Sequence, residues 1–375
     1  MRDRDILIVG GSGVVGRRIA ADLARDYPGR VVIAGRNLAR ALELAAAIGH
    51  GVRGRRIDIA EPSSIAAALE DVGVVISCID QPGRAVLRAA IERGLRYTDM
   101  TPHLTELGRG AAYEEICAAA RASGAKVVLG TGIVPGISNM MVRALADTLG
   151  GADEIETALL LSASDVSGPA SFDYFLQELT MPFDICVDGE DRPAWAFSDA
   201  RLVEFPLPAG PHLAYLFPFS DQVLYPRTMG ARTALTRLAI EPKWLARVLA
   251  VAVGFGVARI MAIDGLRHAI ARRRKDRPSA DGARFALRVD VRHAGRTGHA
   301  TLLGRTQADA AAAGAVGVAR PLIDGEVAHA GAWMPEQVVN PAAFLSRLAA
   351  QGLKVEFSEN ISPVQAMPLP AAASA

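Results

Sequence analysis

The stretch from residue 5 to residue 16 constrains this chain more than any other part of it. Ile6 to Val9 form an uninterrupted apolar run, which is typical of a strand buried on both faces of a parallel sheet. A glycine-rich turn follows at once, in which Gly11, Gly13 and Gly16 fit the pattern Gly-x-Gly-x-x-Gly. Residues 17–27 then show helical spacing of apolar side chains, so strand, turn and helix come in this order.

This order predicts a site for the pyrophosphate of a dinucleotide. Free backbone N–H groups and the helix dipole favour an anion at the start of such a helix. The first glycine permits the tight turn, the second lets the backbone approach the phosphates, and the third lets helix and strand pack closely. The alternative is a glycine-rich turn that holds no ligand. We expect the following residues to contact the cofactor: Gly10, Gly11, Ser12, Gly13, Val14, Val15 and Gly16.

The end of the second expected strand, at residues 30–36, indicates which dinucleotide is bound. NAD-specific proteins place a carboxylate here, but this chain has Gly35, Arg36 and Asn37. A guanidinium suits the 2′-phosphate of NADP by its charge and fork geometry, so we expect NADP as the cofactor. The alternative for Arg36 is a solvated surface arginine. Asn37 is expected to cap the helix that follows through Ile48.

Strands and helices continue to alternate over the first 130 residues, which predicts an α/β, doubly wound Rossmann domain with a mostly parallel sheet. Asp58 ends a short third strand at 55–58, where it either binds the adenine amino group or caps a turn. The fourth strand, at 72–79, ends in Ser77, Cys78 and Ile79, which should face the cofactor crevice. Cys78 is interpreted as a small buried hydrophobe rather than a nucleophile.

A second domain with a mixed or antiparallel sheet is expected to be inserted after residue 137. Alternating residues at 285–291 indicate a half-buried strand, with a turn at 295–298 and a partner at 299–305. A strand at 184–190 is expected to pair with residues 201–205. The domains are therefore the Rossmann domain at 1–137, an α+β substrate and dimerisation domain at 138–325, a return segment packing on the Rossmann domain at 326–358, and a disordered tail at 359–375.

Several motifs of this chain resemble the saccharopine dehydrogenase-like oxidoreductases in order and spacing. The resemblance implies NADP-type dinucleotide binding and reductive chemistry at C–N bonds of amino-acid or polyamine-like substrates. The family also contains enoyl reductases that act on lipid chains. The motifs are Gly10-Gly-Ser-Gly-Val-Val-Gly16, Ala34-Gly-Arg-Asn37, Val75-Ile-Ser-Cys78, Tyr97-Thr-Asp99, Pro135-Gly-Ile-Ser-Asn139, Met334-Pro-Glu336, Asn340-Pro-Ala-Ala-Phe-Leu345 and Gly352-Leu-Lys-Val355.

Asp99 and His103 are the candidates for proton transfer near the crevice, because they follow the end of a strand. Their alternatives are a loop cap for Asp99 and a surface residue for His103. No tyrosine has a lysine four residues later, which argues against a short-chain dehydrogenase. The substrate side is expected to include Asp173, Tyr174, Asp221, Tyr225 and Arg227.

The leading interpretation is an NADP(H)-dependent oxidoreductase that transfers hydride to or from a C=N bond of a small molecule. The alternatives are a trans-acting enoyl reductase on a lipid-linked substrate and a non-catalytic NADP-binding sensor. The net charge of +1 gives no reason to expect nucleic acid as a partner. The three cysteines have neither metal-ligand spacing nor a disulfide framework, so we expect no metal and a cytoplasmic protein.

The segment at 244–270 is unusual because residues 248–258 carry no charge. Eleven residues are too few to span a bilayer, which needs about 18 to 20. We therefore expect no transmembrane segment. The favoured interpretation is a buried core or dimer-interface helix in a homodimer, and the alternatives are a peripheral membrane contact and an acyl-chain pocket.

Overall fold

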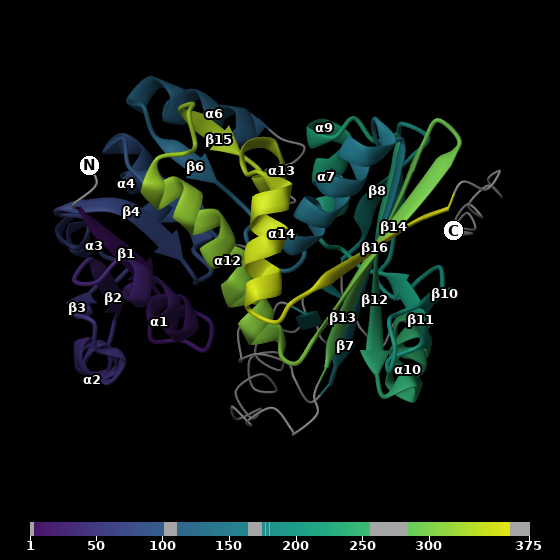
Figure 1. Cartoon of the computed structure of the whole chain (residues 1–375), viewed down its shortest axis with the longest axis horizontal. Helices are drawn as coiled ribbons and strands as arrows, with labels where there is room; N and C mark the ends of the chain where they lie inside the picture. The colour runs from purple at the N-terminus through teal and green to yellow at the C-terminus, as the bar shows by residue number, and fades with distance from the viewer. Residues whose placement is uncertain are drawn as a thin grey trace. The chain divides into compact units, whose positions relative to one another are not determined.

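The computed structural model describes residues 4–100, 111–163, 175–176, 178–179, 181–255 and 284–360. The chain divides into two compact units (Figure 1). The first unit holds residues 1–137 and 308–348, and the second holds residues 138–307 and 349–375.

The first unit is built on a seven-stranded parallel sheet with the order β15-β6-β5-β4-β1-β2-β3. The order reverses between β1 and β4, which is the switch point where doubly wound sheets bind their ligands. The strands are β1 (Asp5–Val9), β2 (Val31–Gly35), β3 (Arg53–Arg56), β4 (Val72–Ser77), β5 (Arg96–Asp99), β6 (Lys126–Val128) and β15 (Gly331–Trp333).

Helices connect the strands of this sheet and cover it (Figure 1). The helix α2 begins after Asn37, whose side chain accepts a hydrogen bond from the N–H of Arg40 at 3.0 Å, so the expected cap is confirmed. The helices are α1 (Gly16–Asp26), α2 (Leu38–Ile48), α3 (Pro62–Ala68), the 3-10 turn η1 (Pro82–Arg84), α4 (Ala85–Glu92), α6 (Ala111–Ser123), α12 (Gln307–Asp324), α13 (Pro335–Val338) and α14 (Pro341–Ala350).

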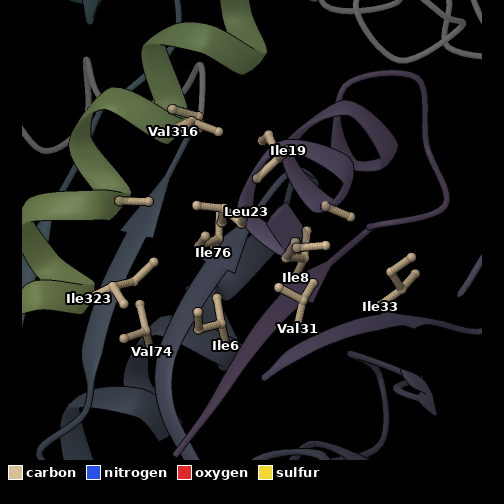
Figure 2. Close-up of a cluster of buried hydrophobic side chains, with 14 of the residues drawn as sticks. Ile6, Ile8, Ile19, Leu23, Val31, Ile33, Val74, Ile76, Val316 and Ile323 are labelled. Carbon is tan, nitrogen blue, oxygen red and sulfur yellow. The ribbon is translucent and has the colours of Figure 1, made fainter. Parts of the chain in front are cut away.

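One hydrophobic cluster joins β1, β2 and β4 to α1 and α12 (Figure 2). Ile19 and Leu23 of α1 and Val316 and Ile323 of α12 are all buried in it. The two helices therefore cover the same face of the sheet, although nearly 300 residues separate them in the sequence. Burial of such side chains contributes roughly 1.5–3 kcal/mol each.

The helix α12 lies in the first unit, whereas the sequence placed it in the second domain, which was expected to end at 325. Its residues are small or apolar on nearly every side, so its pattern does not reveal which sheet it covers. A Cβ atom at Gly314 would lie 2.6 Å from the carbonyl oxygen of Gly132, so only glycine allows the helix so close to that loop. The third strand is also shifted, since it ends at Arg56 and leaves Asp58 in the following loop.

The second unit contains a nine-stranded mixed sheet with the path β10-β11-β12-β7-β13-β14-β16, and β8 pairs with both β12 and β9. Only the β12–β7 pair is parallel. The elements are α7 (Ile137–Leu149), β7 (Glu154–Ser162), β8 (Phe183–Val187), β9 (Glu190–Ala194), β10 (Arg201–Glu204), β11 (Pro211–Leu216), α9 (Asp221–Thr228), β12 (Thr233–Glu241), α10 (Lys243–Gly254), β13 (Phe285–His293), β14 (Arg296–Gly304) and β16 (Val355–Asn360).

Charged side chains occupy one face of this mixed sheet. Arg237 on β12 is 2% exposed and donates to Glu156 on β7 and to Asp199, each at 2.6 Å. Arg201 on β10 forms a second ion pair with Glu156. A buried arginine is tolerated because two carboxylates compensate its charge. The cluster ties the β10 strand and the loop before it onto the sheet.

The predicted pairing of β13 with β14 is confirmed, and three other features of this sheet differ from the sequence prediction. The strand β8 pairs with β9 across the tight turn at Asp188 and Gly189, and β10 pairs with β11 instead of β8. The β13–β14 turn lies at residues 294–295, because a two-residue loop with positive φ joins antiparallel strands directly. The strand β16 pairs with β14 in the second unit, whereas the return segment was expected on the Rossmann domain. Residues 361–375 of the expected tail lie outside the described residues.

Within the described ranges, none of the helices combines the length and apolar character that spanning a bilayer would require.

Candidate functional site: a dinucleotide crevice at the sheet switch point

The glycine-rich turn joins β1 to α1 at the switch point of the parallel sheet. A Cβ atom at Gly16 would lie 2.4 Å from the carbonyl oxygen of Gly10 and 2.7 Å from the Cα atom of Gly11. Gly10 has a φ of 76°, and a Cβ atom there would lie 2.4 Å from the side chain of Ile79. Both positions therefore require glycine, one for helix packing and one for the turn itself.

Several N–H groups of this turn are left for a ligand. Gly13 donates to the carbonyl of Gly10 at 2.9 Å, but no hydrogen bond from the N–H of Ser12, Val14 or Val15 occurs within the described chain. The first turn of α1 contains no acidic residue. Unpaired N–H groups at a helix start attract an anion, so the turn fits a pyrophosphate.

The end of β2 lies beside the turn, because a Cβ atom at Gly35 would be 3.6 Å from the hydroxyl oxygen of Ser12. Arg36 is exposed, and its guanidinium has no hydrogen-bond or ion-pair partner among residues 4–100 or the other described ranges. Asn37 uses its side-chain oxygen as the α2 cap. Among residues 35–37, Arg36 is therefore the one charged side chain, and no described residue compensates its positive charge.

Asp58 lies in the loop after β3 and is engaged locally. Its carboxylate accepts a hydrogen bond from the N–H of Ala60 at 3.1 Å, and its own N–H donates to Ser64 at 2.9 Å. Of the two interpretations of Asp58, the turn cap is the one with a partner in the structure. Contact with adenine stays a prediction.

The end of β4 supplies Ser77, Cys78 and Ile79, which lie next to β1 in the sheet. Burial, followed by the nearby charge of Asp99, raises the pKa of the Cys78 thiol to about 12. Thiolate is the nucleophilic form of cysteine, so a thiol that keeps its proton near neutral pH is unsuited to that role. The interpretation of Cys78 as a small apolar residue agrees with this environment.

Asp99 ends β5 and belongs to a buried polar network. It is 2% exposed, and its carboxylate accepts a hydrogen bond from the Tyr97 hydroxyl at 3.0 Å. That hydroxyl accepts from the side-chain N–H of Gln81 at 2.5 Å, and Gln81 also donates to Ser77 at 3.1 Å. The network thus joins the carboxyl ends of β4 and β5.

The direction of these hydrogen bonds is set by the backbone. The side-chain oxygen of Gln81 accepts from the N–H groups of Val86 and Leu87 at the start of α4, at 3.1 and 3.4 Å. The amide nitrogen of Gln81 must then face Tyr97, which leaves the tyrosine proton for Asp99. A hydrogen bond donated to a carboxylate favours its charged form. Burial and the Asp99 charge also raise the pKa of Tyr97 well above its usual value.

The remaining candidates are only partly described. His103, Asp173 and Tyr174 lie outside the described residues. Asp221 and Tyr225 are buried in the second unit, and Arg227 is exposed at the end of α9. Asp221 accepts hydrogen bonds from Thr236 at 2.8 Å and from the N–H of Gln222 at 2.9 Å, so its partners are those of a structural carboxyl.

Burial raises the pKa of Asp221 to about 6, which makes folding stability depend on pH. A raised pKa means that the folded state holds the proton more tightly than the unfolded state does. The stability that the protonated Asp221 contributes is therefore lost as pH rises from about 4 through 6. We expect Asp221→Asn to stabilise the protein above pH 6 by about 1–3 kcal/mol relative to wild type, and less at pH 4. Denaturant unfolding at both pH values measures this. The exposed Asp147→Asn serves as control, and an equal change at both pH values would contradict the prediction.

Sequence reasoning missed Gln81, and it named Tyr97 in the motif Tyr97-Thr-Asp99 without giving this residue a role. Gln81 lies between a strand and a helix, so its position does not stand out by residue pattern. The side chains meet because β4 and β5 are neighbours, with Ser77 opposite Asp99 in register.

The comparisons with known proteins agree with this geometry. Residues 6–128 match the family model described as the saccharopine dehydrogenase NADP binding domain, so the predicted resemblance to saccharopine dehydrogenase-like proteins is confirmed. No curated protein matches the chain.

The fold of the whole chain is also found in a solved structure. Apo saccharopine dehydrogenase (L-Glu forming) from Saccharomyces cerevisiae aligns with a TM-score of 0.65 and 15% identity, over 95% of this chain and 100% of that one. At this identity the likeness shows a shared fold, and the predicted Rossmann domain with a separate mixed sheet is confirmed.

Two further structures align over most of the chain but too loosely to carry an argument. The C. glutamicum DAP dehydrogenase in complex with DAP has a TM-score of 0.46 at 14% identity, over 94% of this chain and 99% of that one. GenD2 from gentamicin A biosynthesis, in complex with NAD, has 0.44 at 14%, over 96% and 97%. The domain match supports an oxidoreductase that uses a nicotinamide dinucleotide.

Proposed function

We propose that this protein is an NADP(H)-dependent oxidoreductase of the saccharopine dehydrogenase-like type, acting on a C=N bond of an amino-acid or polyamine-like substrate. The observation that carries the cofactor assignment is the unpartnered Arg36 at the end of β2, beside a turn with unpaired N–H groups. The choice of a C=N substrate rests on the resemblance to the saccharopine dehydrogenase-like oxidoreductases alone, because the matched residues 6–128 correspond to the cofactor-binding domain.

The chain's own residues bind and orient the dinucleotide in this proposal. The N–H groups of Ser12, Val14 and Val15 hold the pyrophosphate, and Arg36 pairs with the 2′-phosphate. The side chains at the end of β4 line the crevice beside the turn. The nicotinamide, when bound, supplies or accepts the hydride.

Asp99 is proposed to move the proton that accompanies hydride transfer. The Tyr97 hydroxyl donates to its carboxylate, which suits Asp99 to accept a proton in the oxidative direction. His103 remains the alternative proton donor by its position in the sequence.

Cofactor titration tests the role of Arg36. A charge-assisted hydrogen bond contributes roughly 1.5–3 kcal/mol, so NADPH should bind at least about tenfold more tightly than NADH. Arg36→Ala should remove that preference by weakening NADPH only, because NADH has no 2′-phosphate. Calorimetry on both cofactors measures the four affinities. The control is Arg25→Ala, which removes an exposed arginine from the last turn of α1. Equal affinities in the wild type, or equal losses in the variant, would show that Arg36 is a surface arginine.

Turnover assays separate the proposed activity from its alternatives. We expect NADPH oxidation with mixtures of a 2-oxo acid and an amine, which form an imine in solution. Oxidation with an enoyl thioester alone would indicate the lipid-directed reductase. Tight NADPH binding without oxidation by either substrate class would indicate a sensor.

A further inference from the structure

The helix α10 of the second unit is apolar on two opposite faces. Ala246, Leu249 and Val253 pack into the cluster formed with β11 and β12. The opposite face forms a stripe at helical spacing that no described residue covers, and we call it the α10 stripe. Its members and their exposed fractions are Trp244 at 62%, Val248 at 53%, Val251 at 58% and Phe255 at 83%. The helix is therefore only half buried, so it is not a helix buried on all sides within the described chain, and the expected dimer interface stays a prediction.

Both charged residues of α10 itself are positive, and the exposed Glu241 precedes the helix. Lys243 and Arg247 flank the α10 stripe, and neither takes part in an ion pair with the described residues. The helix itself contains no acidic side chain. Both cations border a pocket of about 240 Å³, whose apolar wall includes Leu202. Leu202 belongs to β10 and is 62% exposed.

We propose that the α10 stripe docks on the surface of an anionic lipid bilayer, with the helix lying in the plane of the interface. Apolar side chains with tryptophan on one face and flanking cations are what such a surface binds. The helix from Lys243 to Gly254 has 12 residues, so it can lie on a bilayer but cannot cross it.

The charges favour a bilayer over a second copy of this chain. A two-fold interface would apply the same patch to itself and bring Lys243 and Arg247 of both copies into one contact. The helix offers no carboxylate, and the exposed Glu241 before it, one in each copy, would compensate only two of those four cations. Anionic lipid headgroups compensate them directly. This inference does not depend on the proposed enzymatic activity.

Vesicle flotation of the full chain tests the proposal. The wild type should bind phosphatidylglycerol-containing vesicles, bind phosphatidylcholine vesicles more weakly, and dissociate as salt rises. The double variant V248S/V251S should lose at least about tenfold in vesicle affinity. The control L38S/L42S removes two leucines of α2 that are 40% and 50% exposed, and it should bind like the wild type. K243Q/R247Q should weaken binding to anionic vesicles by about tenfold or more and leave binding to neutral vesicles unchanged.

Fluorescence of Trp244 gives a second measurement. In a W195F/W333F background, its emission should shift to shorter wavelength when phosphatidylglycerol vesicles are added. Failure of the wild type to bind vesicles, or equal binding by V248S/V251S, would overturn the proposal. If the wild type is instead a dimer that V248S/V251S converts to a monomer, a second copy covers the stripe. If V248S/V251S unfolds at a lower temperature than the wild type, and the wild type does not bind vesicles, residues 256–283 of the chain cover the α10 stripe.

Discussion

Gly16→Ala is expected to weaken NADPH binding by at least about tenfold and to destabilise the first unit by about 1–3 kcal/mol. The added methyl group would lie 2.4 Å from the carbonyl oxygen of Gly10 and 2.7 Å from the Cα atom of Gly11. Both of these atoms belong to the backbone, so no side-chain rotation relieves the contact. The helix α1 must move away from β1, and its N–H groups move with it.

The two effects of Gly16→Ala are measured by calorimetric titration with NADPH and by denaturant unfolding. Gly254→Ala is the matched control, because a Cβ atom there meets no atom within 4 Å and its φ is ordinary. We expect this control to bind NADPH like the wild type. A Gly16→Ala variant with wild-type affinity would show that the close packing of α1 on β1 does not position the phosphate site.

The first unit could be predicted largely from sequence because its signals are local. The run Ile6–Val9, the three glycines and the helix after them specify one supersecondary unit. The Asn37 cap and the fourth strand follow from residues close together in the chain. Local patterns also place Arg36 at a strand end, and the structure adds that its guanidinium has no described partner.

The return of the chain to the first unit, at residues 308–348, could not be predicted from local patterns. The strand β15 is three residues long and joins the sheet beside β6, a pairing that spans some 200 residues. A strand of three residues is too short to show an alternating hydrophobic pattern. The helix α12 is buried on most sides, so its sequence does not say which neighbour it packs against.

The second unit was predicted least well because pairing there depends on partners distant in sequence. The alternating pattern and the turn after it predict β13 and its partner β14, but they do not select the neighbour on the other side of β13. That neighbour is β7, which lies more than 100 residues earlier in the chain. The Arg237 ion pairs also join distant elements, so no motif reveals them.

The candidate site shows the same difference between features formed by neighbouring residues and features formed by distant ones. The glycine-rich turn could be predicted from the sequence because seven consecutive residues, 10–16, form it. The polar network around Asp99 was not, because Ser77, Gln81 and Tyr97 come from a strand end, a loop and the next strand. Sequence alone marked Asp99 as the residue at a strand end, and the network shows what holds its carboxylate.

Asp99→Asn is expected to lower turnover by about 10²- to 10⁴-fold, the usual contribution of a proton-transfer group. NADPH affinity should change by less than about twofold, since Asp99 is not assigned to any part of the dinucleotide. The amide keeps the shape of the carboxylate but cannot take up the proton. The change should therefore appear in kcat and in kcat/KM together. Steady-state kinetics in the oxidative direction, with parallel NADPH titration, measures both quantities.

Tyr97→Phe separates the chemical role of Asp99 from a structural one. This variant keeps the carboxylate but removes the hydroxyl that donates to it at 3.0 Å and that accepts from Gln81 at 2.5 Å. An unpaired buried polar group costs about 1–3 kcal/mol, so stability should fall. Turnover should fall less than in Asp99→Asn, because the carboxylate that takes up the proton is kept. Asp99→Asn could instead lose stability and keep its turnover per folded molecule. That result would show that the network only holds β4 and β5 together, and that a group other than Asp99 transfers the proton.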